Sequence, residues 1–464
     1  MSRRVVVVGG GVAGLATAYR LMVDERGVDV TLLEGSDRVG GKLRPIEVGD
    51  LVLEAGADSF VARRPWAIEL CKELGLGADL ITPGSSSAYV WTDAGLERYL
   101  KGSAFGIPGD IGDVLRWPGL SRAGRMRAAR DLVKKARKGD QDESLGGLLR
   151  RRLGDEATDL SVGPLLAGLF AGDVDRLSVR ATFPELADWE RTQGSLIRGS
   201  QAATRNAASA RSGPIPPMFV KLRGGVSRLT DELARRLGDR ARIGAAATSI
   251  LAAGSGFEVG LADGSAVPAD DVILAGSASA SAELVGELAP EAAAELAGIP
   301  YASTGVVLLV YGDGTASGLP EGSGFVVPRG KAPMTACTWV SSKWPEEAFR
   351  SRAVLRCYVG GVGDEDILDA SDEDIVEGCV RHVAAVVDVP DPPEHTAVHR
   401  WMNAMPQYEV GHLDRVRRIR DALPPGIVVT GSAYGGVGIP DCIRQATETA
   451  AAILETAGTD KETV

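Results

Sequence analysis

The sequence predicts an α/β fold in which one parallel sheet is assembled from the start, the middle and the end of the chain. Four consecutive valines at 5–8 form a short apolar run, which is typical of a buried parallel strand, and glycines and a helical pattern follow it. A second apolar run at 272–275 has the same character, and a third at 427–431 also leads through glycines into a helix. We therefore expect two insertions to interrupt one domain.

Each element follows from its own pattern. Apolar residues at helical spacing predict a helix at 12–22, and residues 28–33 predict a strand that ends at Glu34. Residues 36–60 are loop-rich, 108–210 are largely helical, and 205–217 are rich in Asn, Ser, Gly and Pro, as expected of a linker. The remaining expectations are helices at 65–74, 226–237 and 440–456, strands at 241–250, 256–261, 304–311 and 353–359, and an Asp-Gly turn at 263–264.

Length and composition are those of an ordinary globular protein. The chain has 464 residues, of which 44% are hydrophobic and 24% charged, enough for about three domains. Acidic residues number 62 and basic residues 51, and this excess of negative charge disfavours a nucleic-acid-binding protein. The five cysteines lack the paired spacing of a zinc site or a disulfide framework, so we expect reduced thiols and no metal.

The N-terminus resembles a secretory signal in one respect, since Arg3 and Arg4 precede an uncharged run from Val5 to Tyr19. That run holds several glycines, which suit a turn better than a signal helix, and it is too short to span a membrane. No other stretch approaches about 18 apolar residues. We therefore expect a cytoplasmic protein with at most peripheral contact with the inner face of the membrane.

The first glycine motif, Gly9-Gly10-Gly11-Val12-Ala13-Gly14, lies between the strand and the helix of a β-α-β unit. Gly9 permits a tight turn, Gly11 lets the backbone approach a pyrophosphate, and Gly14 lets helix and strand pack closely. The helix N-terminus would hold the phosphates. Glu34, further along the second strand, is suited to accept hydrogen bonds from ribose hydroxyls. The pattern predicts a Rossmann-type dinucleotide site.

A second motif, Arg38-Val39-Gly40-Gly41-Lys42, follows directly. Its glycines would bring the backbone to the cofactor, and its two cations would balance phosphate charge. Nicotinamide dehydrogenases do not need this element, so it favours a flavin dinucleotide. A third motif, 431–439, provides another helix N-terminus, which can face the pyrimidine end of a flavin, where negative charge develops on reduction.

Together the three motifs resemble the flavin amine oxidase superfamily, and longer segments are similar to its protoporphyrinogen and coproporphyrinogen oxidase family. These segments are 168–173 with 177–178 and 183–184, then 400–412, and 438–442; residues 56–60 also match a segment near the flavin, with Ala57 where proline is usual. The resemblance spans nearly the whole chain. It implies an α/β protein with a Rossmann-type FAD-binding domain in discontinuous segments (1–80, 218–290 and 411–464), an α+β substrate domain (81–107 and 291–410) and a mainly helical insertion (108–210).

The resemblance also implies which residues bind FAD. The expected set comprises Gly9, Gly10, Gly11, Val12, Ala13, Gly14, Glu34, Gly35, Arg38, Gly41, Lys42, Gly56, Ala57, Asp58, Ser59, Ala247, Trp401, Gly431, Val437, Gly438 and Ile439. Ala247 stands where family members usually carry valine beside the adenine. The porphyrinogen family binds its flavin noncovalently, so we expect no covalent linkage through the nearby Cys442.

Two branches of the family differ in substrate. The protoporphyrinogen IX branch usually places an arginine before the aromatic strand Tyr89-Val90-Trp91, where this chain has Ala88. This departure, and the Pro-Gln-Tyr…Gly-His segment, resemble the branch typical of Gram-positive bacteria and actinobacteria, which oxidises coproporphyrinogen III to coproporphyrin III in heme biosynthesis. The resemblance implies stepwise hydride transfer to flavin N5, six electrons in total, with O2 reduced to H2O2. No catalytic side chain is expected, because the pyrroles stabilise the cation that hydride loss leaves behind.

A substrate with four propionates requires cations near the entrance. We expect Arg63 and Arg64 there, with Phe170 and His412 as further substrate residues, although a core position is the alternative for His412. The stretch 116–152 carries twelve cations against four acids: Arg116, Arg122, Arg125, Arg127, Arg130, Lys134, Lys135, Arg137, Lys138, Arg150, Arg151 and Arg152. Its role stays open between a solvated helix face, a surface for anionic lipid, and a rim that guides substrate or docks a downstream heme-pathway ferrochelatase.

Three alternative functions remain: a protoporphyrinogen IX oxidase, an amine oxidase or carotenoid desaturase on the same scaffold, and a non-catalytic relative that has lost its flavin. An aromatic content of 5% disfavours the aromatic cage of an amine oxidase. The intact glycine turns near both chain ends disfavour a protein without flavin.

Overall fold

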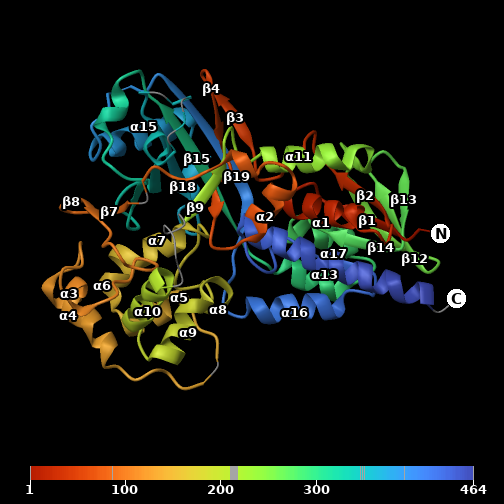
Figure 1. Cartoon of the computed structure of the whole chain (residues 1–464), viewed down its shortest axis with the longest axis horizontal. Coiled ribbons are helices and arrows are strands. Elements are labelled where there is room, and N and C mark those ends of the chain that lie inside the picture. Colours follow the sequence, from red (N-terminus) through yellow and green to blue (C-terminus); the bar gives the residue numbers. More distant parts are fainter. Residues whose placement is uncertain are drawn as a thin grey trace.

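The computed structural model describes residues 2–85, 87–139, 141–209, 218–344, 346, 348–349, 351–390 and 392–462. Within these ranges the chain forms a Rossmann-type region, a second region built on an antiparallel-rich sheet, and a group of helices beside both (Figure 1). The predicted α/β fold is thus confirmed. No helix in the described ranges is both long enough and apolar enough to cross a bilayer.

The Rossmann-type sheet has five parallel strands in the order β10-β2-β1-β14-β20. They are β1 (Arg4–Val8), β2 (Asp29–Glu34), β10 (Ala241–Ile243), β14 (Asp271–Leu274) and β20 (Ile427–Val429). The central strands are buried because helices or strands cover both faces. The sheet therefore draws its strands from three distant stretches of the chain and brings their C-terminal ends to one edge.

Two different layers cover this sheet. On one face α1 (Val12–Val23), α11 (Arg228–Leu237) and α17 (Ile439–Glu462) share a hydrophobic core with α2 (Trp66–Glu73). On the other face lie α12 (Ala278–Val285), α13 (Pro290–Ala297), α16 (His412–Ala422) and the small sheet β11 (Ala247–Ala253), β12 (Gly256–Leu261) and β13 (Ala266–Ala269). Figure 1 shows α1 and α17, from opposite ends of the chain, side by side.

The second region is a seven-stranded sheet in the order β19-β15-β18-β17-β16-β7-β8. Its strands are β7 (Ala88–Thr92), β8 (Gly95–Arg98), β15 (Tyr301–Val310), β16 (Gly324–Val326), β17 (Met334–Trp339), β18 (Val354–Gly360) and β19 (His395–Pro406). Helix α15 (Asp372–Ala384) packs on one face. The opposite face meets the hairpin β3 (Pro45–Val48) and β4 (Leu51–Glu54), and α14 (Val340–Lys343) follows β17. This opposite face therefore looks toward the Rossmann-type region.

The helical region lies below that sheet in Figure 1. It consists of α3 (Ile111–Val114), α4 (Arg122–Ala129), α5 (Leu145–Arg152), α6 (Asp155–Ala157), α7 (Gly163–Gly168), α8 (Val179–Thr182), α9 (Pro184–Gln193) and α10 (Leu196–Ser209). A hydrophobic core of its own holds it together and extends to Tyr408 and Val437. A small sheet of β5 (Phe60–Val61), β9 (Phe219–Leu222) and β6 (Leu80–Ile81) is separate from the helical region and shares the hydrophobic core of α2.

Three local expectations differ from the structure. Residues 205–209, expected in a linker, are the last residues of α10, and 210–217 lie outside the described residues. The loop-rich stretch 36–60 contains the hairpin β3–β4, whose strands are too short for a clear alternating pattern. The FAD-binding segment was expected to end at residue 290. Helix α13, most of which lies beyond that residue, still packs against α16 in the core beside the Rossmann-type sheet.

Candidate flavin site

The first glycine motif forms a tight strand-to-helix turn. Gly9 has a φ of +114° and its N–H donates to the Leu33 carbonyl oxygen at 2.8 Å. A Cβ on Gly14 would fall 1.9 Å from the Gly9 carbonyl oxygen, so only glycine lets α1 approach the turn. A Cβ on Gly11, in contrast, would meet open space. The backbone at Gly11 is therefore accessible to a ligand at the N-terminus of α1.

Glu34 at the end of β2 closes the same turn. Its Oε2 accepts a hydrogen bond from the Gly10 N–H at 2.6 Å, and its Oε1 accepts from the Ser36 N–H at 2.8 Å and the Ser36 hydroxyl at 2.7 Å. A Cβ on Gly10 would lie 2.8 Å from the Glu34 carboxylate, which explains why glycine is needed there. An ionised carboxylate has about four acceptor sites, so Glu34 retains capacity for a ribose hydroxyl.

A cavity of 430 Å³ lies at this edge of the sheet, between the Rossmann-type strands and the small sheet that begins at Ala247. Its wall includes Gly9, Glu34, Gly35 and Ala247, which the sequence assigned to one site. Gly276, which follows β14, was not assigned and also lines it. The cavity thus joins the N-terminal β-α-β unit to the middle stretch of the chain, at the position where the nucleoside end of a dinucleotide would bind.

The second glycine motif lies directly beside the first. The Gly40 N–H donates to the Gly10 carbonyl oxygen at 2.8 Å, and a Cβ on Gly41 would lie 3.3 Å from the Gly11 Cα. The Arg38 guanidinium donates to the carbonyl oxygens of Gly41 (3.1 Å) and of Leu43 (2.5 Å). Arg38 therefore braces its own loop, and the accessible backbone of the two motifs is left facing outward.

Lys42 connects this loop to the next segment and to the last helix. A Cβ on Gly56 would fall 1.6 Å from the Lys42 carbonyl oxygen, so the two backbones are in direct contact. The Lys42 side chain is open to solvent yet surrounded by protein on most sides, and this environment lowers the pKa of its ammonium. Burial raises the pKa of the Cys442 thiol to about 12, and Lys42 opposes that rise. Lys42 therefore lies between the first motifs and the start of α17.

Segment 56–59 is held to the seven-stranded sheet. The Trp401 Nε1 donates to the Ala55 carbonyl oxygen at 2.9 Å, and the buried Arg356 of β18 donates to the Gly56 carbonyl oxygen. The Nε and Nη1 atoms of Arg356 are buried without a hydrogen-bond partner among the described residues. Trp401 therefore fixes the backbone of this segment, and Ala57, at its tip, is exposed.

Asp58 and Ser59 interact with protein groups. The Ser59 hydroxyl donates to the Asp58 carboxylate at 2.7 Å, and the Trp344 Nε1 donates to the same carboxylate at 3.2 Å. Burial alone would raise the pKa of Asp58, but Lys343, at 3.4 Å, and Arg356 hold it far below its usual value. Asp58 and Ser59 therefore anchor the segment to α14 and to Trp344, the residue that follows it.

The third glycine motif completes the site from the other end of the chain. A Cβ on Gly431 would lie 3.5 Å from the Ala13 Cβ, which places this turn at the N-terminus of α1. In the part of the chain that the structure describes, the N–H groups of Val437, Gly438 and Ile439 donate no hydrogen bond within the protein. Helix N-termini leave such donors for a ligand or solvent. The start of α17 therefore offers three free N–H groups beside Lys42 and α1.

Tyr408 joins this turn to the helical region. Its hydroxyl donates to the Ser432 carbonyl oxygen at 2.7 Å and accepts from the Gly436 N–H at 2.9 Å. Its ring stacks on His412 with centroids 4.0 Å apart and lies 5.8 Å from the ring of Phe170. The structure thus brings Phe170 and His412, two of the four expected substrate residues, into contact with the ring of one tyrosine whose role the sequence did not indicate.

His412 is a buried core residue in this stack. Burial, reinforced by the nearby Arg415, lowers the pKa of His412 to about 4. Its imidazole is therefore neutral near pH 7. Phe170 is likewise buried, and its carbonyl oxygen accepts from the Gln407 Nε2 at 2.8 Å. The next residue, Ala171, has a φ of +49°, a strained backbone conformation for a residue with a side chain.

The two expected entrance cations behave differently. Arg63 is exposed and makes no ion pair among the described residues. Arg64 forms an ion pair with Asp441 in the first turn of α17. This pair was not expected, because a single sequence does not reveal which side chains meet across 377 positions.

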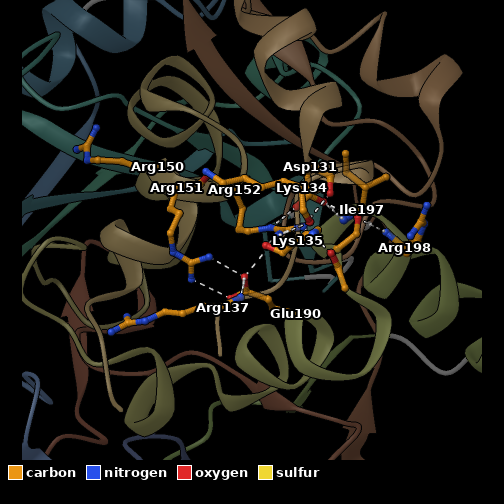
Figure 2. Close-up of polar contacts among 12 residues, drawn as sticks. Asp131, Lys134, Lys135, Arg137, Arg150, Arg151, Arg152, Glu190, Ile197 and Arg198 are labelled. Atoms are coloured by element: carbon orange, nitrogen blue, oxygen red, sulfur yellow. Dashed lines mark hydrogen bonds and ion pairs between the residues drawn. The ribbon is translucent and has the colours of Figure 1, made fainter. Parts of the chain in front are cut away.

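The basic stretch 116–152 is partly neutralised by ion pairs inside the helical region. In Figure 2, Arg151 and Arg152 reach toward Glu190, at 2.6 Å and 3.3 Å. Arg152 is fully buried and also pairs with Asp131, while Arg150 pairs with three aspartates. The exposed cations without an ion pair among the described residues are Arg122, Arg130, Lys134, Lys135 and Lys138, of which Lys134 donates to the Arg151 carbonyl oxygen. The buried part of this charge therefore holds helices together.

The geometry fits a flavin dinucleotide. A cavity between Glu34 and Ala247 suits its nucleoside end, the open backbone at Gly11 suits its pyrophosphate, and the free N–H groups at the start of α17 suit the electron-rich end of its ring. When bound, a flavin supplies a two-electron hydride acceptor that protein side chains lack.

Comparison with known proteins agrees with this geometry. The family model of the flavin-containing amine oxidoreductases matches residues 12–454, so the chain belongs to that family and is a flavin-dependent oxidoreductase. It is similar to proteins named coproporphyrinogen III oxidase: 36% identical to that of Bacillus subtilis (strain 168), over 96% of both chains, and 33% identical to that of Mycobacterium bovis, over 98% of both. A crystal structure from Exiguobacterium sp. 255-15, of a protein assigned as a protoporphyrinogen oxidase, matches with a TM-score of 0.86 and 30% identity, covering 98% of this chain and 99% of that one.

Proposed function

We propose that the protein is an FAD-dependent, oxygen-dependent coproporphyrinogen III oxidase of heme biosynthesis. The convergence of Gly11, Lys42 and the start of α17 around one site, in a chain similar to coproporphyrinogen III oxidases over nearly its full length, carries this proposal. The overall reaction converts one coproporphyrinogen III and three O2 to one coproporphyrin III and three H2O2. Six electrons would leave the substrate as three hydrides, together with three protons; a noncovalently held FAD would supply the hydride acceptor, at N5.

The protein's own contribution is placement. The turns at Gly9 and Gly40 would hold the pyrophosphate, and the α17 N-terminus would stabilise the negative end of the ring. No side chain is required as a strong base, because the pyrroles stabilise the positive charge left by hydride loss. The neutral, buried His412 agrees with this, since its position in an aromatic stack suits a wall of the site better than proton transfer.

We propose that exposed or half-buried arginines at the rim bind the substrate carboxylates. Arg63 is exposed, and Arg98 of β8, paired with Tyr89, donates to the Ser87 hydroxyl directly beside Ala88. Arg98 therefore places a guanidinium beside Ala88, the position at which the protoporphyrinogen IX branch usually carries an arginine. Arg98→Ala would raise the KM for coproporphyrinogen about tenfold or more while leaving the flavin spectrum unchanged, since charged hydrogen bonds are worth about 1.5–3 kcal/mol.

The decisive experiment compares two substrates. Anaerobically prepared coproporphyrinogen III and protoporphyrinogen IX are added in air to the purified flavin-loaded enzyme, and porphyrin fluorescence and H2O2 are followed. We expect faster turnover of coproporphyrinogen III and one H2O2 for each two electrons removed. Faster turnover of protoporphyrinogen IX would assign the protein to the sister activity, and no porphyrin from either substrate would refute a porphyrinogen oxidase.

The exposed cations of the helical region carry a second proposal, about partners. Arg122 and Arg130 lie on α4 and just beyond it, and an electropositive face there would suit either an anionic leaflet or a downstream ferrochelatase. Sedimentation with anionic and with neutral vesicles tests the lipid contact, because an electropositive face would bind only the anionic vesicles. An Arg122→Gln, Arg130→Gln double variant would lose the binding to anionic vesicles.

A further inference from the structure

An acidic residue lies in the first turn of the helix that faces the proposed flavin ring. Asp441 is the third residue of α17 and is 7% exposed. Its side chain packs against the glycine turn: a Cβ on Gly436 would lie 2.6 Å from it, and a Cβ on Gly438 would lie 3.0 Å from its Oδ2. A buried carboxylate therefore lies within the same turn as the free N–H groups of residues 437–439.

Such a carboxylate opposes the electrostatic function of the helix end. The N-terminus of a helix carries about half a positive charge, and one ionised carboxylate beside it reverses the sign of the local charge. The end of a flavin ring that contains N1 and C2=O becomes more negative on reduction. An uncompensated Asp441 would therefore make hydride acceptance less favourable.

Arg64 compensates this charge from another element. It precedes α2, and its Nη1 pairs with the Asp441 Oδ1. Two other cations lie near this turn. Arg444 donates to the Gly435 carbonyl oxygen and pairs with Glu448, and Lys42 forms no ion pair with Asp441 among the described residues. The Asp441 Oδ1 is engaged by Arg64, and no N–H group of residues 437–439 donates to the carboxylate in the part of the chain that the structure describes.

We propose that the Arg64–Asp441 ion pair sets the charge that the N-terminus of α17 presents to the flavin ring. Arg64 is then a positioning residue for the redox potential, beyond the substrate contact that the sequence suggested for it. This assignment rests on the flavin position given under the proposed function, and it does not depend on which porphyrinogen is the substrate.

The test is a double-mutant cycle that removes each charge of the pair, measured on the flavin itself. The midpoint potential and the affinity of the oxidised flavin for sulfite, which adds to N5, are measured in the flavin-loaded wild type and in Arg64→Gln, Asp441→Asn, the double variant and Arg64→Lys. Arg64→Gln should make the potential more negative and weaken sulfite binding about tenfold, equivalent to about 1.4 kcal/mol. Asp441→Asn should shift both in the opposite direction, and the double variant and Arg64→Lys should lie near the wild type.

Arg20→Gln is the matched control. Arg20 forms a similar ion pair between elements, with Glu73, toward the other end of α1, and its loss should leave the potential unchanged. Equal or same-direction shifts in Arg64→Gln and Asp441→Asn, or no shift in either, would overturn the proposal, as would loss of flavin from every variant at this pair. Failure of the wild type to oxidise coproporphyrinogen III would instead refute the proposed function while leaving this result intact.

Discussion

The backbone of Gly56 lies directly against that of Lys42, so that a Cβ on Gly56 would fall 1.6 Å from the Lys42 carbonyl oxygen. The contact joins the loop of the second glycine motif to the segment that Trp401 and Arg356 hold against the seven-stranded sheet. The hairpin arm at Gly56 therefore lies between the loop of the second glycine motif and two side chains of the seven-stranded sheet, at the edge of the proposed flavin site.

This contact predicts a severe effect of Gly56→Ala. The added methyl group cannot be accommodated without moving the Lys42 loop, so we expect unfolding to become easier by about 3 kcal/mol or more and flavin binding to weaken strongly. Denaturant unfolding and flavin titration of the apoprotein measure the two effects. Gly286→Ala is the control, because a Cβ there makes only ordinary contacts of 3.5 Å, and wild-type behaviour of Gly56→Ala would contradict the close approach.

Tyr408→Phe tests the link between the helical region and the last glycine turn. It leaves the Ser432 carbonyl and the Gly436 N–H without their partner, which should cost about 1–3 kcal/mol of stability and weaken flavin binding roughly tenfold. Tyr99→Phe removes a similar hydrogen bond, to the Ser161 carbonyl oxygen, far from the turn. It should lower stability alone, and equal flavin affinities in the two variants would show that Tyr408 has no special role.

His412 predicts a component of acid destabilisation. Its pKa in the folded protein, about 4, lies below the value of about 6.5 expected when unfolded, so the unfolded chain binds the proton more tightly. The stability that this neutral imidazole allows is complete above pH 6.5 and is lost as the pH falls toward 4. Relative to His412→Gln, the wild type should lose about 2 kcal/mol between pH 7.5 and pH 5. Parallel unfolding curves for the two proteins over this range would refute the shift.

The buried ion pairs of the helical region predict a structural effect without a flavin effect. Arg152→Met leaves the fully buried Asp131 without its cation, while Glu190 keeps Arg151, and we expect stability to fall by about 3–5 kcal/mol. Arg116→Ala removes an exposed pair with Asp113 and should change stability by less than about 1 kcal/mol. Urea unfolding and flavin absorbance measure both, and a stable Arg152→Met variant would show that the network contributes little.

Local patterns in the sequence predicted much of the fold. Strand and helix periods gave β1, α1, β2 and α17, and glycine spacing gave the turns that the structure brings together, because both depend on a few neighbouring residues. The contacts that complete the site are different in kind. Arg64 with Asp441, and Tyr408 with Gly436, join residues from separate elements, and no local preference encodes such a pairing.

The basic stretch 116–152 likewise shows that a local segment of sequence does not reveal contacts with other elements. Its excess charge stands out in the sequence, yet Arg151 and Arg152 turn inward to Glu190, an acid outside the stretch. Counting charges within a window therefore overstates the charge that a surface displays, because the compensating groups come from other helices.

The assembly of the Rossmann-type region from both chain ends has a consequence during synthesis. Strand β20 and helix α17 are synthesised after every other strand of this sheet, and until they dock beside α1 the proposed flavin site would lack one wall. With the proposed site, stable flavin binding would therefore follow the synthesis of α17. A flavin bound there would also hold α17 against α1, so that a shortened polypeptide lacking α17 would lose both its prosthetic group and the helix that packs beside α1.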